Sequence, residues 1–525
     1  MAKVVAVDAG TTGVRAAVVD ERARVTDVAY RELTQHFPRP GWVEHDPAEI
    51  WEAVCATLAE VGTRLANAGQ RAEAIGITNQ RETLVAFDRS SGRPLHNAIV
   101  WQDRRTAPLC AELTEAGYLP LVRATTGLVL DPYFSATKAA WLLREADLAL
   151  GPSDQGLSFC TVDTWVLWNL TGGADTDRGG SRKGAVYATD PSNASRTLLF
   201  DTATRTWSAD LCELFGVPVH TLPEVRPSAG RIGTAALGGL GDAAPALDGV
   251  PISGVLGDQQ AALFGQACFD PGMAKVTYGT GSFVLANAGP QRPDAPDGLT
   301  VSCAWDLGPY VGTRPAVAYA LEGSAFVSGA AIQWLRDGLG IIESAEEIGP
   351  LAQSVPDSGG VTFVPALTGL GSPWWDPQAR GIVTGITRGA GRAKLARACV
   401  EAIAFQVRDM TDAMNQALAA ASSAPLSALR ADGGAAAMDL LLELQAEQSR
   451  LHVTRPRSLE STALGAATLA GLIEGVWSSL DELAAHWEAE RLYEPQHPLE
   501  LADATYDVWC RAVEKAKGWA PADPS

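Results

Sequence analysis

The sequence lacks the features that mark membrane, secreted and zinc-stabilised proteins. No run approaches the roughly 20 apolar residues of a membrane span, and the opening MAKVVAVDAG lacks the apolar core and cleavage site of a signal peptide. Its eight cysteines form no C-x-x-C pair and stand near no histidine cluster, so we expect buried free thiols rather than disulfides or a zinc site. These absences favour a cytoplasmic protein without a membrane span.

Basic residues are also in the minority. Lys and Arg number 41 against 61 acidic residues, which gives a net charge of −20. A surface of that sign repels a phosphate backbone, so nucleic acid is not expected as a partner. The hydrophobic fraction of 46% is that of an ordinary globular protein, and 525 residues are too many for one core. We therefore expect at least two domains.

Strand and helix patterns alternate along the chain. In residues 45–69, Asp46 is a candidate N-cap, Pro47 stands at the first helical position, and apolar residues recur at helical spacing up to Gly69. Residues 72–106 predict three strands, the last ending at Trp101, and residues 426–456 predict strand, Gly-Gly turn, helix and strand. This alternation indicates an α/β architecture in which helices cover sheets.

Two hairpins of similar design open the two halves of the chain. VVAVDAGTTGVRAAVVD (residues 4–20) and MAKVTYGTGSFVLANAG (residues 273–289) each place a Gly/Thr turn between apolar strands. Such turns offer backbone N–H groups and hydroxyls to an anion, and two facing turns could hold a polyphosphate between domains. Asp8 beside the first turn is then placed to act on a magnesium ion through its waters.

The alternative is that both hairpins carry ordinary β-turns. Neither is a Walker A loop, because no Gly-Lys-Ser/Thr follows, and neither is a dinucleotide fingerprint, because a strand follows each turn. The pairing of the turns, with a third glycine loop at residues 432–435, favours the phosphate interpretation.

Seven ordered blocks give the chain a family resemblance. It resembles the glycerol kinases, within the sugar and polyol kinases that share the actin and hexokinase type of ATPase core. The blocks are ITNQRETLVAFDRSSGRPLHNAIVWQDRRT, LDPYFSATKAAWLL, TVDTWVLWNLTGG, SNASRTLLFD, PISGVLGDQQAALFGQACFDPGMAKVTYGTGSF, LEGSAFVSGAAIQWLRDGL and TALGAATLAGL. The resemblance runs from about Val4 to beyond Trp477, and the NQRET and GDQQ blocks favour glycerol over sugars.

The resemblance implies a glycerol site and a catalytic base. The matching positions are Arg81, Glu82, Trp101, Tyr133, Asp258, Gln259 and Phe283. Polar groups would bind the hydroxyls of the triol, and Trp101 and Phe283 its C–H face. From the residues alone, Arg81–Glu82 is an ion pair at a strand end, Trp101 a core aromatic and Asp258 a helix N-cap. The resemblance instead makes Asp258 the base that accepts the hydroxyl proton.

The resemblance also implies a nucleotide site. Its positions are Thr11, Thr12, Gly13, Arg15, Thr280, Gly329, Gln333, Gly434 and Met438, with Asp8 at the metal. The chain departs from the family at Ala9, Gly13 and Val14, where a glutamine and two serines are usual, and at Met438 and Asp439, where an asparagine pair is usual. These changes bear on nucleotide affinity more than on the reaction. The extra segment Ala174–Gly184 is expected to be a surface loop.

These expectations describe an ATP- and Mg²⁺-dependent glycerol kinase that makes sn-glycerol 3-phosphate. We expect an α/β fold of two actin/hexokinase-like (ribonuclease H-like) ATPase domains, residues 1–254 and 255–525, closing a cleft over ATP and glycerol. The resemblance implies a homo-oligomer, dimer or tetramer. One alternative is a kinase for another polyol or a sugar such as xylulose. The other is a nucleotide-binding regulatory homologue with weak catalysis, against which the retained Asp258 argues.

Overall fold

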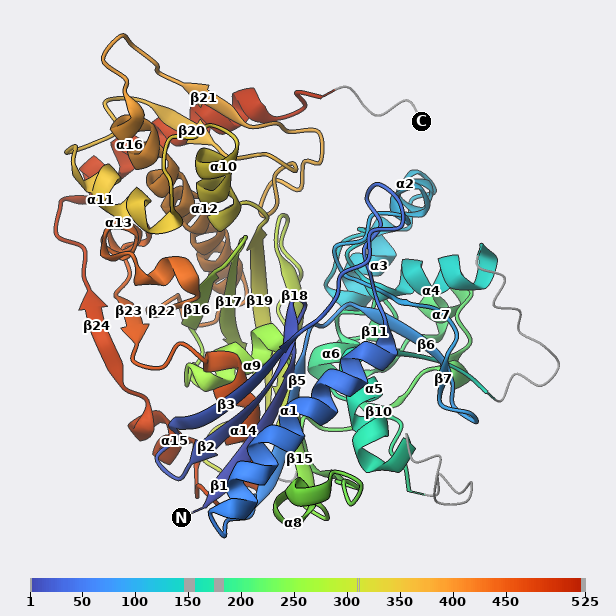
Figure 1. Cartoon of the computed structure of the whole chain (residues 1–525). Helices are drawn as coiled ribbons and strands as arrows, with labels where there is room; N and C mark the ends of the chain where they lie inside the picture. Colours follow the sequence, from blue (N-terminus) through green and yellow to red (C-terminus); the bar gives the residue numbers. More distant parts are fainter. Residues whose placement is uncertain (1, 146–155, 174–183, 309, 311, 521–525) are drawn as a thin grey trace.

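The computed structural model describes residues 2–145, 156–173, 184–308, 310 and 312–520. The predicted surface loop Ala174–Gly184 lies outside the described residues, apart from Gly184. Figure 1 shows the first sheet with α1 in the lower part of the view, and α10–α13 with α16 gathered in the upper part.

The first sheet is built around the predicted N-terminal hairpin. Its strand order is β14-β15-β5-β1-β2-β3. β1 and β2 pair antiparallel with Asp8 opposite Arg15, and β5 adds to β1 in parallel. The strands are β1 Lys3–Ala9, β2 Gly13–Asp20, β3 Val25–Glu32, β5 Ala74–Asn79, β14 Ala229–Thr234 and β15 Pro251–Gly257. The hairpin predicted for residues 4–20 is therefore confirmed.

Both faces of β1 are buried, which explains its unbroken apolar run. Val5 and Val7 pack with α1 (Pro47–Asn67) on one face, while Val4 and Ala6 pack with α14 (Ser461–Ile473) on the other. Burying a valine completely contributes about 1.5–3 kcal/mol. A strand covered on both faces needs no polar alternation.

Helix α1 begins and ends as its sequence predicts. The Asp46 side chain accepts a hydrogen bond from the Ala48 N–H, and Pro47 occupies the first helical position. Beyond the helix, Gly69 has a φ of +65°, a backbone conformation in which glycine carries no steric penalty.

The second sheet repeats the plan of the first. Its order is β18-β19-β17-β16-β22-β23-β24, and the predicted hairpin of residues 273–289 forms its antiparallel pair β16/β17. β22 runs parallel to β16, as β5 does to β1. The strands are β16 Met273–Tyr278, β17 Ser282–Gly289, β18 Thr300–Asp306, β19 Val317–Ala325, β22 Ala428–Asp432, β23 Val453–Pro456 and β24 Ala489–Tyr493. The similarity between the two hairpin sequences thus extends to the sheets that contain them.

A smaller antiparallel sheet carries the loops that approach the first hairpin. It consists of β4 Glu44–His45, β6 Leu84–Asp88, β7 Arg93–Pro94, β8 Ala98–Ile99 and β9 Leu157–Thr161. The third strand predicted before Trp101 is wrong in extent, because it is split into β7 and β8 and ends at Ile99, which leaves Trp101 in a turn. Pro94 ends β7 and has no N–H to continue a ladder.

The remaining elements complete the two halves. Two-stranded pairs join β10 Ala188–Thr189 to β13 Glu224–Val225, β11 Phe200–Asp201 to β12 Thr206–Trp207, and β20 Thr362–Val364 to β21 Ile382–Thr384. The other α-helices are α2 Ala107–Glu115, α3 Leu119–Thr126, α4 Ser135–Arg144, α5 Val162–Trp168, α6 Pro191–Ala194, α7 Ala209–Phe215, α8 Ala244–Leu247, α9 Asp258–Gly265, α10 Gly329–Asp337, α11 Ile348–Gln353, α12 Arg392–Ala420, α13 Asp439–Ser449, α15 Leu480–His486 and α16 Leu499–Ala516. Short helices of other types are η1 Asn169–Gly173, η2 Val219–Thr221, η3 Gly241–Ala243, η4 Ala345–Glu347 and η5 Gly434–Ala437. Among the described residues, none of these helices combines the length and apolarity that crossing a bilayer requires.

Helices α9 and α14 meet at backbone distance. A Cβ added to Gly465 of α14 would lie 1.8 Å from the Ala261 carbonyl oxygen, and one added to Gly265 of α9 would lie 2.0 Å from that of Ser461. α14 belongs to the second half of the sequence but packs on the first sheet, where a Cβ at Gly76 would meet the Ala466 carbonyl at 2.1 Å. The predicted division after residue 254 falls within β15, and the division into domains 1–254 and 255–525 stays a prediction.

Candidate active site

The two Gly/Thr turns form the tips of the two central hairpins. Each is closed by a backbone hydrogen bond, from Gly10 N–H to Gly13 O at 3.0 Å and from Gly279 N–H to Gly281 O at 2.9 Å. Thr12 and Thr280 are exposed on these tips. The N–H and hydroxyl groups of the tips can therefore reach a solvent-side anion.

Glycine is required in both turns by close packing, and in the second turn a Cβ at Gly281 would lie 2.4 Å from the Ala325 carbonyl oxygen. A Cβ at Gly13 would lie 2.4 Å from Tyr30 Oη and 2.5 Å from the Arg31 carbonyl oxygen. This explains why a serine would not fit at this position here. At the second tip, the carbonyl of Gly279 accepts the N–H of Gly329, where an added Cβ would lie 2.6 Å from the same oxygen. The second turn thus rests on the first residue of α10.

Asp8 lies between cationic and anionic neighbours beside the first tip. Its Oδ2 is 3.8 Å from Arg15 Nη1, which is also 3.3 Å from Glu460 Oε2. Burial raises the pKa of Asp8 to about 7, Arg15 opposes this, and Asp258 and Glu460 add to it. A buried carboxylate next to two other acids is stabilised in its ionised form by a cation. Mg²⁺ is commonly held by one or two carboxylates together with waters and substrate phosphates, so Asp8 fits the role.

Asp258 is the first residue of α9, and Gly257 is its N-cap. Asp258 Oδ1 accepts the Gln259 N–H at 2.6 Å and lies 3.3 Å from Arg81 Nε. Within the described part of the chain, no hydrogen bond is made to its Oδ2. Burial raises the pKa of Asp258, an effect that Arg81 opposes and Glu82 increases. One oxygen is therefore fixed by the helix start, while the other is available to a substrate hydroxyl.

A line of polar contacts continues from Asp258 into the second half. Lys275 Nζ donates to Gln259 Oε1 at 2.5 Å and to Thr277 Oγ1 at 2.9 Å, and Thr277 Oγ1 donates to Asp432 Oδ1 at 2.6 Å. Asp432 also accepts from Ser461 Oγ. The sequence interpretation gave Lys275 and Asp432 no role in the site, although Lys275 is the one charged residue of β16 and Asp432 ends β22.

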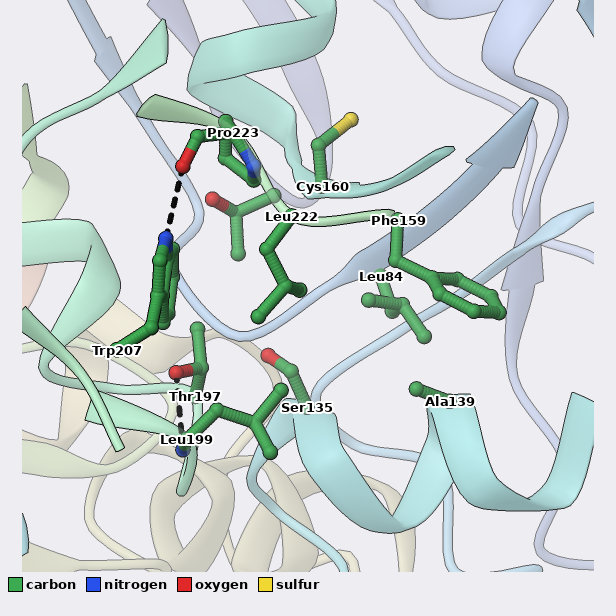
Figure 2. A pocket seen from close by; sticks show the side chains of 11 residues that line it. Leu84, Ser135, Ala139, Phe159, Cys160, Thr197, Leu199, Trp207, Leu222 and Pro223 are labelled. Carbon is green, nitrogen blue, oxygen red and sulfur yellow. Dashed lines mark hydrogen bonds between the residues drawn. The ribbon is translucent and has the colours of Figure 1, made fainter. Parts of the chain in front are cut away.

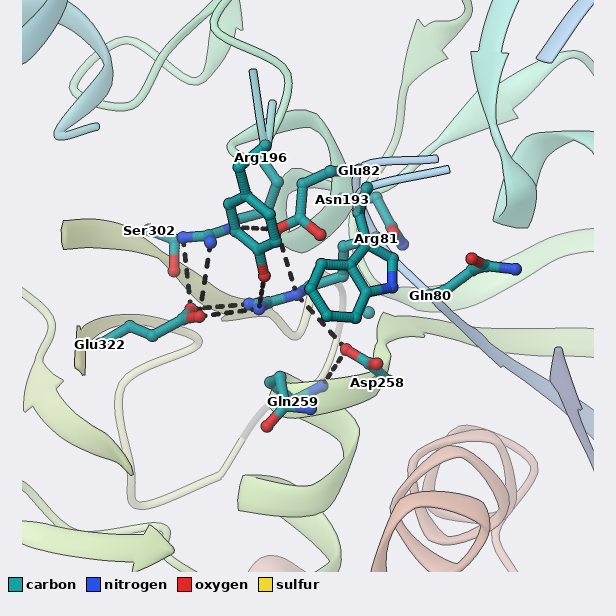
Figure 3. Close-up of polar contacts among 12 residues, drawn as sticks. Gln80, Arg81, Glu82, Asn193, Arg196, Asp258, Gln259, Ser302 and Glu322 are labelled. Atoms are coloured by element: carbon teal, nitrogen blue, oxygen red, sulfur yellow. Dashed lines mark hydrogen bonds and ion pairs between the residues drawn. The ribbon is translucent and has the colours of Figure 1, made fainter. Parts of the chain in front are cut away.

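Four buried charged side chains, Arg81, Glu82, Arg196 and Glu322, contact one another at the expected glycerol site, called the acceptor side below (Figure 3). Arg81 donates both terminal N–H groups to Glu322, at 2.7 and 2.8 Å. Arg196 donates its Nε–H to Glu82 at 2.7 Å and lies 3.2 Å from Glu322. Burial by itself would raise the pKa of Glu322, but the nearby Arg196 and Arg81 lower this pKa to about 2. The expected pair Arg81–Glu82 is thus one half of a quartet, and Arg196 and Glu322 were missed.

Aromatic side chains border this quartet. The rings of Trp101 and Tyr133 meet edge to face with centroids 5.4 Å apart, and Tyr133 Oη accepts from Arg81 Nη2 at 3.5 Å. Trp101 Nε1–H donates to Thr11 Oγ1 at 2.9 Å, so the residues expected to bind glycerol touch the first Gly/Thr turn directly. Phe283 is half-buried on β17, where its Cα pairs with Thr277 and Ser324 of the neighbouring strands.

Gln80 links the same two regions and was also missed. Its Nε2 donates to the Gly10 carbonyl at 3.1 Å, and its Oε1 accepts from Thr83 Oγ1 at 2.7 Å. Thr83 Oγ1 in turn accepts the Trp101 N–H at 3.3 Å. A buried amide in the NQRET block was a signal that the side chain needs several partners.

The expected nucleotide-side residues come from separate elements of the second half. Gly329 begins α10, where Gln333 is exposed, and Gly434 begins η5 with open space around its Cα. Met438 precedes α13 and packs against the apolar core, with Cγ 3.3 Å from the place of a Cβ at Gly349. Asp439 is engaged by Arg455, Arg491 and Tyr493. Its side chain is therefore not free to replace the missing amide.

A separate small cavity lies in the first half and is not the substrate site. It measures about 20 Å³ and lies among mostly apolar side chains between β6, β9 and α4 (Figure 2). This is room for about one water molecule. Ser135 on its border donates to the Glu82 carbonyl at 3.0 Å, so the cavity lies behind the acceptor side.

Met438→Asn is expected to lower the Michaelis constant for ATP a few-fold, because one hydrogen bond contributes about 1 kcal/mol. The constant for glycerol is expected to stay unchanged, and the thermal midpoint to fall because Met438 packs on the core. Steady-state kinetics with each substrate varied will measure this. Met438→Leu is the control, since it keeps the packing without an amide. An ATP constant that stays the same or rises in Met438→Asn would contradict the expectation.

Comparisons with known proteins identify the family of the chain. Residues 3–265 match the N-terminal domain, and residues 274–473 the C-terminal domain, of the FGGY family of carbohydrate kinases. The glycerol kinase of Bordetella parapertussis is 49% identical over 521 residues, covering 98% of this chain and 97% of that protein. The glycerol kinase of Aromatoleum aromaticum is 49% identical over 523 residues, covering 99% and 100%.

Solved structures match over the same length. The crystal structure of Plasmodium falciparum glycerol kinase with ADP has a TM-score of 0.88 at 30% identity, covering 98% of each chain. A xylulose kinase from Lactobacillus acidophilus shares the fold with a TM-score of 0.83 at 20% identity, again over 98% of each chain. The expected resemblance and the two-domain α/β kinase fold are confirmed. The chain belongs to the FGGY family of carbohydrate kinases.

Proposed function

We propose that the protein transfers the γ-phosphoryl group of ATP to a terminal hydroxyl of glycerol, giving sn-glycerol 3-phosphate and ADP. The observation that carries the proposal is the meeting of Arg81, Glu82 and Asp258 beside the rings of Trp101 and Tyr133. A small triol needs several hydrogen-bonding groups and an apolar surface for its C–H face. The glycerol kinases that resemble the chain over its length support the same substrate.

The chemistry follows from the placement of Asp258. Its free Oδ2 accepts the proton of the attacking hydroxyl as the new O–P bond forms and the bond to the β-phosphate oxygen breaks. Arg81 and Glu82 orient the other hydroxyls. Gln259 is the residue after Asp258 in α9, and Phe283 of β17 adds apolar surface. Positioning and charge neutralisation supply most of the rate acceleration in such transfers.

The nucleotide lies between the two hairpin tips in this proposal. Thr11, Thr12, Gly13 and Arg15 on one tip and Thr280 on the other bind the phosphates. Gly329, Gln333, Gly434 and Met438 border the nucleoside. When bound beside Asp8, Mg²⁺ would add positive charge to the phosphate oxygens. Closing of the two halves would exclude water as a competing acceptor.

The setting of the enzyme is inferred from the same relatives. We infer that it works in the cytoplasm in glycerol catabolism, as a homo-oligomer, with ATP and Mg²⁺. Light scattering of the purified protein tests the oligomeric state. Activity assayed with and without EDTA tests the metal requirement.

Glycerol is expected to have the highest kcat/KM in a panel of polyols and sugars assayed by ADP release. The reason is that the acceptor side offers one compact quartet of charges and two aromatic faces, matched to a three-carbon triol. Xylulose and a tetritol are the most informative competitors. A higher kcat/KM for either would show that the preferred substrate is that compound and not glycerol. Nucleotide binding without phosphoryl transfer to any acceptor would show that the protein is a regulatory homologue.

A further inference from the structure

Arg81 and Glu82, the two charged residues proposed to bind the acceptor, are each hydrogen-bonded to an opposite charge on the side away from Asp258. Glu322 takes both terminal N–H groups of Arg81 in a paired arrangement, at 2.7 and 2.8 Å. Arg196 takes one oxygen of Glu82 through its Nε–H at 2.7 Å. Paired and charge-assisted hydrogen bonds are stronger and more directional than neutral ones. Each acceptor-binding side chain is therefore fixed in orientation by one opposite charge (Figure 3).

The two holding residues come from different halves of the chain. Glu322 lies in β19 of the second sheet and is the one charged residue of that strand, VAYALEGSA. Arg196 follows α6 in the first half and reaches β18, where its Nη1 donates to Thr300 Oγ1 at 3.3 Å. Thr300 pairs with Glu322 in the sheet register. Arg196 and Glu322 also contact each other, at 3.2 Å.

This arrangement leaves a defined group for the substrate. With both terminal nitrogens of Arg81 engaged by Glu322, its Nε points toward Glu82 at 3.5 Å and Asp258 at 3.3 Å. Arg81 Nε is buried and has no hydrogen-bond partner of acceptable geometry among the described residues. A buried donor without a partner is costly, so it is suited to a ligand hydroxyl.

Resting on the proposed function, we propose that Glu322 and Arg196 are positioning residues for the acceptor. Glu322 holds Arg81 so that its Nε–H serves a glycerol hydroxyl, and keeps the guanidinium from turning its paired N–H groups onto Asp258. Arg196 holds Glu82 so that its second oxygen serves the substrate. Neither residue touches the reacting atoms.

The central test is Glu322→Gln, which keeps the size of the side chain and removes its charge. Arg81 is then free to form paired hydrogen bonds with the Asp258 carboxylate, which would block the base. We expect the glycerol KM to rise about tenfold and kcat to fall about tenfold, a loss of about 100-fold in kcat/KM. The KM for ATP is expected to stay within about twofold.

Asp409→Asn is the matched control. Asp409 is a buried acid of the second half that accepts from Tyr506 Oη at 2.5 Å and Trp509 Nε1 at 2.9 Å, away from the acceptor side. Its replacement removes a buried carboxyl group without changing any contact of Arg81. We expect a lower thermal midpoint with unchanged KM values for glycerol and ATP.

A second variant keeps the test valid should Glu322→Gln fail to fold. The double variant Glu322→Gln/Arg196→Gln removes one charge of each sign and keeps the buried cluster balanced. If the two residues serve stability alone, the double variant regains the wild-type glycerol KM. Positioning instead predicts a soluble protein whose glycerol KM stays raised while its ATP KM is normal.

Each outcome decides the proposal. It is overturned by a Glu322→Gln enzyme with kcat and glycerol KM near wild type, by equal rises in both Michaelis constants, or by recovery in the double variant. A wild-type enzyme that does not phosphorylate glycerol would overturn the proposed function itself, and the wild-type assay shows this before any variant is made.

Discussion

Asp258→Asn is expected to lower the turnover number for glycerol phosphorylation by about 10²–10⁴-fold, the usual contribution of a positioned acid or base. Asparagine keeps the shape of the side chain and its oxygen can still accept the Gln259 N–H, but it cannot take a proton at neutral pH. The Michaelis constants for glycerol and ATP are expected to change much less. Turnover should be measured with both substrates saturating, by direct determination of the glycerol 3-phosphate formed.

Asp46→Asn is the control for this substitution. Asp46 is also an aspartate at a helix start, where it caps α1 through the Ala48 N–H at 2.8 Å, but it has no place in the site. Both variants are expected to keep the wild-type thermal midpoint, since asparagine can still accept the Ala48 N–H at the N-cap of α1 and the Gln259 N–H at the first residue of α9. Near wild-type turnover in Asp258→Asn would mean that the carboxylate only stabilises the start of α9, and the proposed mechanism would be wrong.

Arg81→Met is expected to abolish measurable glycerol saturation and to lower the free energy of unfolding by about 3–5 kcal/mol, the cost of breaking a buried ion pair from one side. Removing this cation leaves Glu322 and Glu82 sharing Arg196 alone in a site where all four side chains are at most 2% exposed. Denaturant unfolding and steady-state kinetics will measure the two effects separately.

Arg81→Lys separates charge from geometry. Lysine keeps the positive charge but cannot form the paired contact with Glu322, because it offers a single nitrogen. We expect a smaller loss of stability than in Arg81→Met but a comparable loss of kcat/KM for glycerol. Wild-type kinetics in Arg81→Lys would show that any cation at this position is sufficient.

The local features of the fold could be predicted because they depend on neighbouring residues. The hairpins of β1/β2 and β16/β17 follow from apolar runs around Gly/Thr turns, and α1 follows from Asp46, Pro47 and helical spacing. Along α12, the apolar residues at helical spacing Cys399, Ile403, Val407, Met410 and Met414 are fully buried, whereas Leu395 near the start of the helix is only partly buried. In each case one segment of sequence contains the whole pattern.

Contacts between distant segments could not be predicted in this way. Arg196 and Glu322 are 126 residues apart, and their pairing depends on how α6 docks against the second sheet. Only one local signal was available, the single acid in the apolar strand VAYALEGSA, since a buried acid requires a cation. The resemblance supplied Arg81, Glu82 and Asp258 but gave no account of what orients them.

The contact between α9 and α14 has a mechanical consequence. At Gly265 and Gly465 the two helices touch through their backbones, with no side chains between them to change rotamer or compress. Because no side chains can rearrange at this contact, the two helices move together as one rigid unit. Asp258 is the first residue of α9 in this rigid unit, and α14 is fixed to the first sheet by its close contact with Gly76. A tilt of the second sheet against the first would therefore change the distance between the Asp258 carboxylate and the second hairpin tip, while its distance to the first tip would stay the same. Bulk added at either glycine would change the angle at which the two helices pack.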